Sequence, residues 1–471
     1  MIQISNRYGT FSGAKYNNHV DEFLGIQYAR AERFEAPVDI EKYTEIVEAK
    51  SFGAQCPQVP GFMEEILKTK ELPTSEECLY LNIWRPSEVK SPLPVLFWIH
   101  GGAYTNGTAA TSWYHGANLV ELGDVIIVSI NYRLGPFGFI AAHNWGLLDQ
   151  ISALRWVNRN IESFGGDPTN VTIFGESAGG SSVVALTASP STKGLITKAW
   201  AMSPSLLQLR TQAEADEAMT TLFEIARVDS LNGLKGLTTQ QIIDATAQMF
   251  LNLDNYISTF SPTRGGSALP ENVYESSAKS QVPLVVGTNR DENRLWAALN
   301  PQPLEISGAK EYFDQAFKEF SPDAWTIYEQ HMGESSPVQM VSSMQTDRHF
   351  RVPAWQLCDV RSEVDSNTWM YWFTWPTPIF DGVLGCCHAL DLPFMFSNLD
   401  KPNVELFTGA DPVRSKISGH FTTELLKFAK TDKVSWPNYT SSVRSTLRID
   451  VETEVLSEPD PAIRNLWKQI S

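Results

Sequence analysis

The sequence predicts an α/β fold built on a largely parallel sheet. Short runs that are apolar almost throughout occur at 94–99, 125–130, 171–174, 284–287 and 369–373. Strands of this kind are typical of parallel sheets whose two faces are both covered by helices. Strand and helix patterns also alternate along the first half of the chain, which is the order that parallel pairing requires.

One helix can be placed between the second and third runs. Apolar residues fall at steps of three, four and three, at Leu154, Val157, Ile161 and Phe164. This spacing puts them on one face of a helix. The sequence Gly-Gly-Asp-Pro at 165–168 follows and predicts the end of that helix.

The two ends of the predicted sheet differ from its middle. Residues 2–5 and 9–15 flank a short polar turn and indicate a small N-terminal antiparallel sheet. Residues around 205–255 and 300–345 carry helical patterns, which we interpret as insertions that cap the sheet. We find no fixed-period repeat, low-complexity linker or composition break, so we expect a single domain over residues 1–471.

Composition and charge exclude several classes of protein. The 471 residues are 42% hydrophobic and 19% charged, which is typical of a globular chain and excludes a disordered one. The 37 basic and 54 acidic residues give a net charge of −17, which argues against nucleic acid as a partner. No apolar run is long enough to span a membrane, and the first residues do not form a secretory signal. We therefore expect a cytoplasmic protein without a membrane partner.

The cysteines do not indicate a metal site or a disulfide framework. There are five of them, irregularly spaced and without a CxxC pair. We predict no bound metal.

A candidate nucleophile follows the third predicted strand. Gly175-Glu176-Ser177-Ala178-Gly179 lies between the strand at 171–174 and an apolar helical segment. This is the context of a nucleophile elbow, in which the serine stands on a sharp turn from strand to helix. The alternative is a Gly-rich turn with an idle serine.

A candidate oxyanion hole follows the first predicted strand, in the sequence His-Gly-Gly-Ala at 100–103. Serine attack on an ester carbonyl creates an oxyanion that backbone N–H groups must stabilise, and glycine lets the backbone come close. This pattern predicts Gly102, Ala103 and Ala178 as the donors. The alternative is a strand-to-helix loop that needs glycine for flexibility.

These motifs, together with others in fixed order, resemble the type-B carboxylesterase and cholinesterase family. The matching segments are FLGI at 23–26, SEECLYLN at 75–82, HGGA at 100–103, NYRLGP at 131–136, GLLDQ at 146–150, FGGDP at 164–168 and FGESAGG at 174–180. The resemblance implies an α/β-hydrolase fold. The chain is more similar to bacterial p-nitrobenzyl-esterase-like members than to the secreted animal cholinesterases.

The resemblance also implies the rest of a Ser-His-Glu triad. Glu292 matches the family's acid, although Asn293 stands where the family has Gly; Asp291 is the alternative acid. His388 matches the family's base, in a loop that runs on to Pro393-Phe394. Four of the eight histidines precede the elbow, where this fold does not place the base. Of the other four, His388 alone follows a strong predicted strand through a loop of small residues; the others are His331, His349 and His420.

Further matches imply supporting roles. Glu176 and Ser203 resemble groups that support the triad, although Pro204 follows Ser203 where the family has Gly. Cys56 and Cys78 match a family disulfide, or they remain thiols in a reducing compartment. Two ion pairs, Arg33 with Glu76 and Arg133 with Asp149, resemble clamps of the family fold.

The predicted activity is therefore hydrolysis of small-molecule carboxylic esters of short to medium acyl chain, with no cofactor. The segment between Cys56 and Cys78 offers Phe62 but no Trp, which disfavours a cholinesterase because a quaternary ammonium needs an aromatic face. Alternatives are a lipase or amidase of the same fold, or a non-catalytic binding protein.

Overall fold

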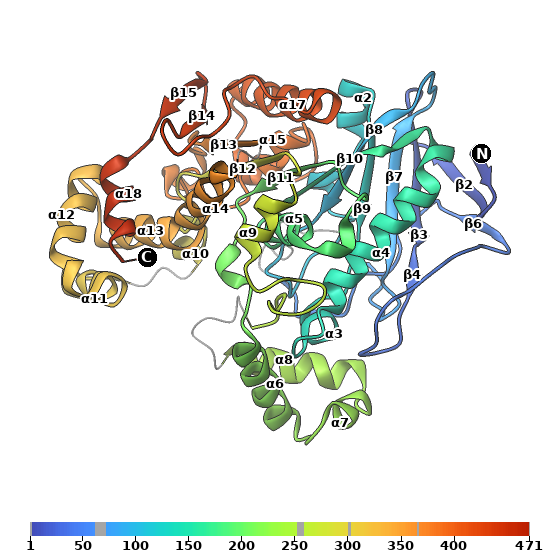
Figure 1. The fold of residues 1–471 in the computed structure, drawn as a ribbon, viewed down its shortest axis with the longest axis horizontal. Helices are drawn as coiled ribbons and strands as arrows, with labels where there is room; N and C mark the ends of the chain where they lie inside the picture. Colours follow the sequence, from blue (N-terminus) through green and yellow to red (C-terminus); the bar gives the residue numbers. More distant parts are fainter. Residues whose placement is uncertain (1, 62–71, 252–258, 300–302, 365–366, 471) are drawn as a thin grey trace.

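The structure is a computed structural model that describes residues 2–61, 72–251, 259–299, 303–364 and 367–470. Its centre is a 13-stranded sheet in the order β1-β2-β3-β7-β9-β8-β10-β11-β12-β13-β14-β15, with β6 beside β2 (Figure 1). The strands are β1 Ile2–Asn6, β2 Gly9–Lys15, β3 Val20–Gln27, β6 Ile46–Glu48, β7 Tyr80–Pro86, β8 Leu93–Ile99, β9 Ile126–Ile130, β10 Gly166–Glu176, β11 Lys198–Met202, β12 Leu284–Asn289, β13 Thr368–Phe373, β14 Ser445–Ile449 and β15 Glu454–Ser457.

The middle of the sheet is parallel, from β9 through β8, β10, β11, β12 and β13 to β14. This confirms the predicted fold class, and each of the five apolar runs is a strand of that parallel part. The predicted N-terminal antiparallel hairpin is β1 with β2, and it joins the edge of the large sheet because β2 pairs with β3. A separate two-stranded sheet is formed by β4 (Ala29–Arg30) and β5 (Val38–Asp39).

The parallel strands are buried on both faces, as their apolar sequences predict. In β8 the side chains of Val95 and Phe97 belong to one hydrophobic cluster, while Leu96 and Trp98 belong to the other. Helices contribute further residues to each cluster. One face is covered by α4 (Trp145–Asn160), α5 (Ala178–Ala188), α9 (Val273–Lys279) and α14 (Val352–Glu363), and the other by α2 (Ala117–Gly123), α15 (Leu392–Met395) and α17 (Val413–Thr431).

The predicted helix before the third strand is α4, continued by a 3-10 turn over Ile161–Phe164. It ends at Gly165, whose φ of 90° lies in the left-handed region that favours glycine. The chain then enters β10 directly at Gly166.

Both predicted insertions are helical and lie beside the sheet as separate lobes (Figure 1). The first contains α6 (Gln212–Ala226), α7 (Leu231–Lys235) and α8 (Thr239–Leu251). The second contains α11 (Ile306–Phe317), α12 (Ser321–Met332) and α13 (Pro337–Thr346), and α18 (Pro461–Lys468) packs on it. Residues 252–255 and 300–302 of the predicted ranges lie outside the described residues.

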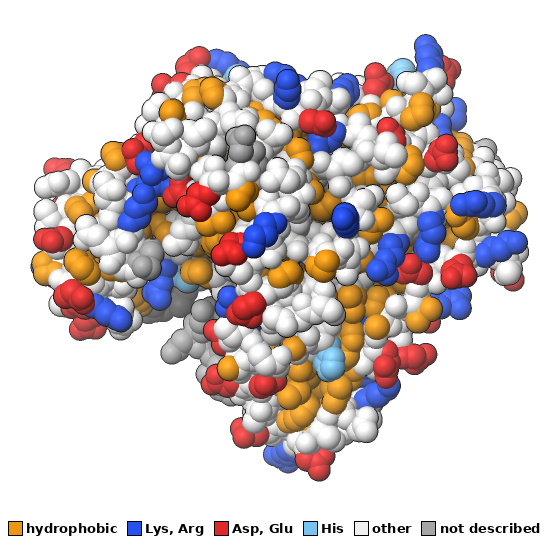
Figure 2. All heavy atoms as spheres, in the orientation of Figure 1, with side chains coloured by type: hydrophobic (Ala, Val, Ile, Leu, Met, Phe, Trp, Pro, Cys, Tyr) orange, Lys and Arg blue, Asp and Glu red, His pale blue; other side chains and the backbone are white. Residues whose placement is uncertain are grey.

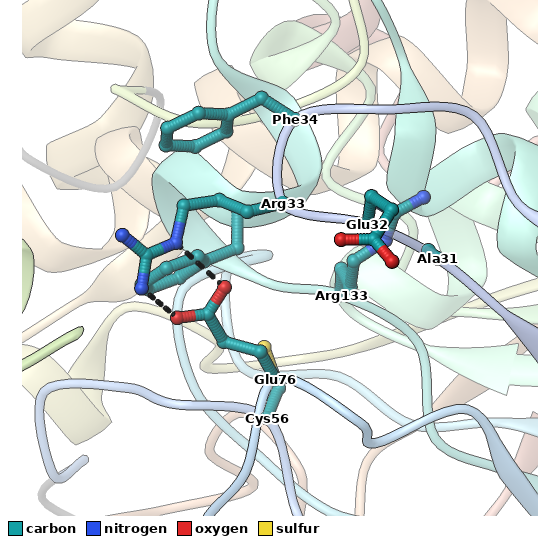
Figure 3. Close-up of a pocket in the computed structure, with 8 residues that line it drawn as sticks. Ala31, Glu32, Arg33, Phe34, Cys56, Glu76 and Arg133 are labelled. Atoms are coloured by element: carbon teal, nitrogen blue, oxygen red, sulfur yellow. Dashed lines mark hydrogen bonds and ion pairs between the residues drawn. The ribbon is translucent and has the colours of Figure 1, made fainter. Parts of the chain in front are cut away.

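Both predicted ion pairs are present. Arg33 forms a two-point pair with Glu76 beside a small cavity, as Figure 3 shows, and it also donates to the carbonyl of Leu237, between α7 and α8 of the first lobe. Arg133 and Asp149 form a two-point pair in the interior, with both N to O distances at 2.8 Å. The first pair thus fastens a helical lobe to the body, and the second clamps the loop after β9 to α4.

The disulfide implied by the family is absent. Cys56 and Cys78 are free buried thiols. Phe62, which is the aromatic residue of the segment between them, lies outside the described residues.

Acidic and basic side chains are interspersed over the face seen in Figure 2, as expected for an ordinary charged surface. Among the described helices, none combines the length and the apolar character needed to cross a membrane.

Candidate active site

Ser177 stands on a sharp turn between β10 and α5. Its backbone has φ 58° and ψ −120°, a conformation that a non-glycine residue adopts only when its surroundings determine it. Its N–H donates to the carbonyl of Met202 on the neighbouring strand at 2.9 Å, and its carbonyl accepts from the N–H of Ser181 at 2.8 Å. The structure thus has the sharp turn from strand to helix that the sequence predicts at Ser177.

The glycines around Ser177 are required by close backbone packing. A Cβ at Gly175 would lie 2.6 Å from the carbonyl carbon of Gly179, and a Cβ at Gly179 would overlap the carbonyl oxygen of Ile99. Such distances leave no room for any side chain. The elbow is therefore pressed against the end of β8, from which the predicted oxyanion loop begins.

The loop after β8 lies directly against the elbow. A Cβ at Gly101 would be 2.9 Å from the Glu176 carbonyl oxygen and 3.2 Å from Ser177 Cβ. The next residues, Gly102 and Ala103, have φ values of 103° and 52°. The structure thus brings the predicted loop to the predicted nucleophile, with Ala178 as the first residue of α5.

His100, at the start of this loop, is a neutral buried side chain. Its Nδ1 lies 2.8 Å from the carbonyl oxygen of Gly101, and its ring stacks on Tyr132 at 4.6 Å. The Tyr132 hydroxyl donates to the carbonyl of His100 at 2.9 Å. Burial lowers the pKa of His100 to about 4, so the histidine brings no charge to the loop.

His388 and Glu292 form a buried pair. The Nδ1 atom of His388 lies 2.6 Å from Oε2 of Glu292, and neither side chain is appreciably exposed. The other carboxylate oxygen of Glu292 accepts from the N–H of Asn289 at 2.7 Å. The carboxylate is therefore fixed in position and orients the imidazole.

Asp291, the alternative acid, joins the two loops instead. Its Oδ2 accepts from the N–H of Cys386 at 2.8 Å, and its own N–H donates to the Cys386 carbonyl at 2.9 Å. Its carboxylate also pairs with Arg290 and Arg294. Asn289 adds a further link, since its Nδ2 donates to the carbonyl of Cys387 at 2.8 Å. These contacts hold the loop of His388 against the loop of Glu292.

The second nitrogen of His388 reaches the elbow. Its Nε2 lies 3.0 Å from Oε1 of Glu176, the residue before Ser177. Burial opposes the charged imidazole, but Glu176 and Glu292 outweigh that effect and raise the pKa of His388 to about 9. Burial raises the pKa of Glu176 to about 8. The two side chains therefore compete for a proton at the elbow.

A further buried carboxylate lies behind the triad residues. Asp391 accepts from the Tyr371 hydroxyl at 3.2 Å and lies 3.5 Å from the Asn289 amide. Burial and, secondarily, the charge of Glu292 raise its pKa to about 7. Asp391 precedes α15, whereas Tyr371 lies on β13, so this contact has no local signal in the sequence.

Two aromatic rings pack against His388, and sequence analysis missed both. The ring centroids of Trp296 and Phe350 each lie 4.8 Å from that of the imidazole, and the two rings stack on each other at 5.9 Å. Trp296 lies on α10 (Arg294–Leu299), four residues after Glu292, and that closeness in sequence was a usable signal. Phe350 lies in the turn of π-helix that follows the second insertion, and only the fold brings it here.

Ser203 lies at the end of β11 with φ 41°, and its N–H donates to the carbonyl of Gly287 at 2.8 Å. Its buried hydroxyl has no hydrogen-bond partner among the described residues. Its supporting role stays a prediction. Within the same residues no cluster of His, Cys, Asp and Glu suited to a metal ion is found.

Comparison with known proteins identifies the family. A profile described as the carboxylesterase family matches residues 1–467. The chain belongs to the carboxylesterase family. It is 34% identical to a para-nitrobenzyl esterase of Bacillus subtilis, over 97% of this chain and 96% of that one. It is 29% identical to a phenmedipham hydrolase of Pseudarthrobacter oxydans, over 93% and 94% of the two chains.

Solved structures of this family share the whole fold. A PNB esterase matches with a TM-score of 0.87 at 32% identity, covering 98% of this chain and 99% of the other. A carboxylesterase of Geobacillus stearothermophilus matches with a TM-score of 0.86 at 31% identity, covering 99% of each chain. The carboxylesterase described here therefore has the α/β-hydrolase fold, and it hydrolyses carboxylic esters with a Ser-His-Glu triad.

Proposed function

We propose that Ser177, His388 and Glu292 are the triad of this carboxylesterase. The observation that carries the proposal is the position of His388, whose Nδ1 is 2.6 Å from Glu292 while its Nε2 faces the elbow beside Ser177. A base must be oriented by an acid on one nitrogen and must present the other to the nucleophile. Glu292 orients one nitrogen of His388, and the contact of the other with Glu176, the residue before Ser177, supports the second role.

In the proposed reaction, Nε2 of neutral His388 takes the proton of the Ser177 hydroxyl as Oγ attacks the ester carbonyl. The tetrahedral intermediate collapses, the bond to the alkoxy oxygen breaks, and the alcohol leaves with the proton from His388. Water then gives a proton to His388 and attacks the acyl-enzyme. Release of the carboxylic acid returns that proton to Ser177. Glu292 stabilises the imidazolium in both halves.

The oxyanion of each intermediate is proposed to be held by the N–H groups of Gly102, Ala103 and Ala178. The packing of Gly101 on Glu176 and Ser177 supports this role, because it brings the loop next to the reacting serine. Ala178 begins α5, so the positive end of that helix also faces the developing charge. These donors belong to the backbone and need no reorganisation during the reaction.

Glu176 is proposed to hold His388 in the resting enzyme. Because its carboxylate lies 3.0 Å from Nε2, it stabilises the imidazolium, which cannot act as a base. The active form is therefore expected to appear as the pH rises through the raised pKa of His388. Ser203 is proposed as a more remote supporting residue.

Short to medium acyl esters are the proposed substrates. The likeness to para-nitrobenzyl esterase over nearly the whole chain supports small esters. A series of p-nitrophenyl esters of increasing chain length, together with a triglyceride emulsion, tests the preference. The organisation as one domain and the cytoplasmic location stay predictions.

The triad is tested by replacing Ser177 with Ala and measuring turnover of p-nitrophenyl acetate. We expect activity to fall by about 10⁴-fold or more while the thermal unfolding curve is unchanged. Ser191→Ala, at an exposed serine 14 residues further on (191 − 177), is the matched control and should retain full activity. Substantial activity in Ser177→Ala would refute the proposal.

A further inference from the structure

The oxyanion loop is held in an unfavourable backbone shape. Gly102, Ala103 and Tyr104 have φ values of 103°, 52° and 62° in succession. The left-handed region suits glycine but is unfavourable for Ala and Tyr. Such a shape persists only where surrounding contacts impose it, so the contacts at the base of the loop determine where its N–H groups point.

Gly107 closes the loop against its own beginning. The N–H groups of Thr105 and Asn106 donate to the carbonyl of Gly102 at 2.9 and 3.0 Å, which turns the chain back. Gly107 follows with φ 112°, and a Cβ there would lie 2.6 Å from His100 Nδ1 and 2.7 Å from the Gly101 carbonyl oxygen. Its backbone is thus packed directly on the peptide that precedes Gly102.

A single side chain from a distant segment fixes Gly107. The Oε1 atom of Gln58 accepts from the N–H of Gly107 at 2.7 Å, and its Nε2 donates to the carbonyl of Gly107 at 3.1 Å. The same Nε2 donates to the carbonyl of Cys56 at 2.9 Å. The amide of Gln58 therefore pairs with Gly107 in both directions, as a neighbouring strand would, and is itself fixed to its own segment.

The segment of Gln58 also supports the far side of the loop. The N–H of Leu134 donates to Sγ of Cys56 at 3.2 Å, and the N–H of the next residue, Gly135, donates to the carbonyl of Tyr104 at 2.7 Å. Gln58 thus holds the end of the loop at Gly107. Cys56 holds the neighbouring segment, which is hydrogen-bonded to Tyr104 in the middle of the loop.

We propose that Gln58 is a positioning residue for the oxyanion hole. The inference rests on the proposed roles of Gly102 and Ala103. Without the amide of Gln58, Gly107 can move away from His100, and the strained residues can relax towards ordinary φ values. Their N–H groups then lose alignment with the oxyanion. Because that charge exists only in the transition state and the intermediates, the loss should lower kcat and leave KM nearly unchanged.

The test replaces Gln58 with Met, which has a similar volume and cannot form these hydrogen bonds. We expect kcat for p-nitrophenyl acetate to fall about 10- to 100-fold, with KM within about twofold. Inhibition by a trifluoromethyl ketone, which forms an oxyanion on the serine, should weaken by the same factor as kcat/KM. A merely structural role would not link these two quantities.

Gln55→Met is the matched control, because Gln55 lies in the same segment and its side chain has no hydrogen bond to any described residue. It should retain wild-type kcat and inhibitor affinity. If Gln58→Met does not fold, Gln58→Glu serves, since it keeps the acceptor for Gly107 N–H but loses both donated bonds; it should show the same linked losses.

Unchanged kcat and inhibitor affinity in a folded Gln58 variant would overturn this inference, as would a change in KM alone. Either result together with an inactive Ser177→Ala would leave the proposed triad intact. Activity in Ser177→Ala would instead refute the proposed function itself.

Discussion

The two halves of the active site are built in different ways. The nucleophile half consists of two short continuous segments, 100–107 and 175–180, in which glycines let backbones pack at distances that exclude a side chain. The acid and base half consists of loops about 100 residues apart in sequence, around Glu292 and His388, joined by hydrogen bonds and charge. Steric constraints shape the first half, and electrostatics shapes the second.

This difference predicts different responses to mutation. Replacing one of the closely packed glycines should act first on packing and hence on folding. Replacing a carboxylate that contacts His388 should leave the fold intact and act on proton affinity and turnover. Conservative substitutions in each half therefore test this distinction.

Among variants of the charged half, the largest effect on turnover is expected from Glu292→Gln. The amide can still accept from the N–H of Asn289, but it cannot stabilise the imidazolium of His388. We expect kcat to fall by about 10³- to 10⁴-fold with little change in thermal stability, measured with p-nitrophenyl acetate and by thermal unfolding.

Asp291→Asn is the companion variant to Glu292→Gln. Asp291 binds the N–H of Cys386 and two arginines instead of His388, so we expect the unfolding temperature to fall while kcat stays within about tenfold of wild type. If Asp291→Asn lost more activity than Glu292→Gln, the assignment of the acid would be wrong.

In the glycine-rich half, Gly179→Ala should act on the fold. The Cβ of the alanine would overlap the carbonyl oxygen of Ile99. A backbone oxygen cannot rotate away from such a clash as the end of a flexible side chain can. We expect the free energy of unfolding to fall by about 3 kcal/mol, measured by denaturant titration. Gly419→Ala, at a helical glycine with open space around it, is the control and should be neutral or stabilising. Equal stability of the two variants would contradict the steric account.

The smallest predicted effect is a shift in pH dependence. Glu176→Gln removes a carboxylate 3.0 Å from Nε2 of His388, which lowers the pKa of the imidazole. Neutral His388 is then available at lower pH, so the acidic limb of the kcat/KM profile should move down by about 1 unit. An unmoved limb, or one that moves up, would show that Glu176 does not control this proton.

Much of the nucleophile half could be predicted from sequence. A position without room for a Cβ must be glycine wherever the chain folds this way. Gly175 and Gly179 in the sequence therefore indicate the tight turn directly. Apolar runs likewise predicted five of the parallel strands, because both faces of each are buried; these are β8, β9, β10, β12 and β13.

The contacts of the charged half have no local signature. His388 and Glu292 were placed through the family resemblance, whereas Phe350 and Tyr371 reach their partners only through the fold. The raised pKa of His388 was equally unpredictable, because an unperturbed imidazole has a pKa near 6.5 and the shift depends on which carboxylates surround it. Gln58 was missed because its partner, Gly107, lies in another segment.

The triad is tested most directly by labelling the enzyme with an excess of an alkyl fluorophosphonate and mapping the product by mass spectrometry. We predict one phosphonyl group per chain, on the peptide that contains Ser177, with activity lost in proportion to labelling and no label on Ser177→Ala. Complete loss of activity with the group on another residue, or with Ser177 unmodified, would contradict the account.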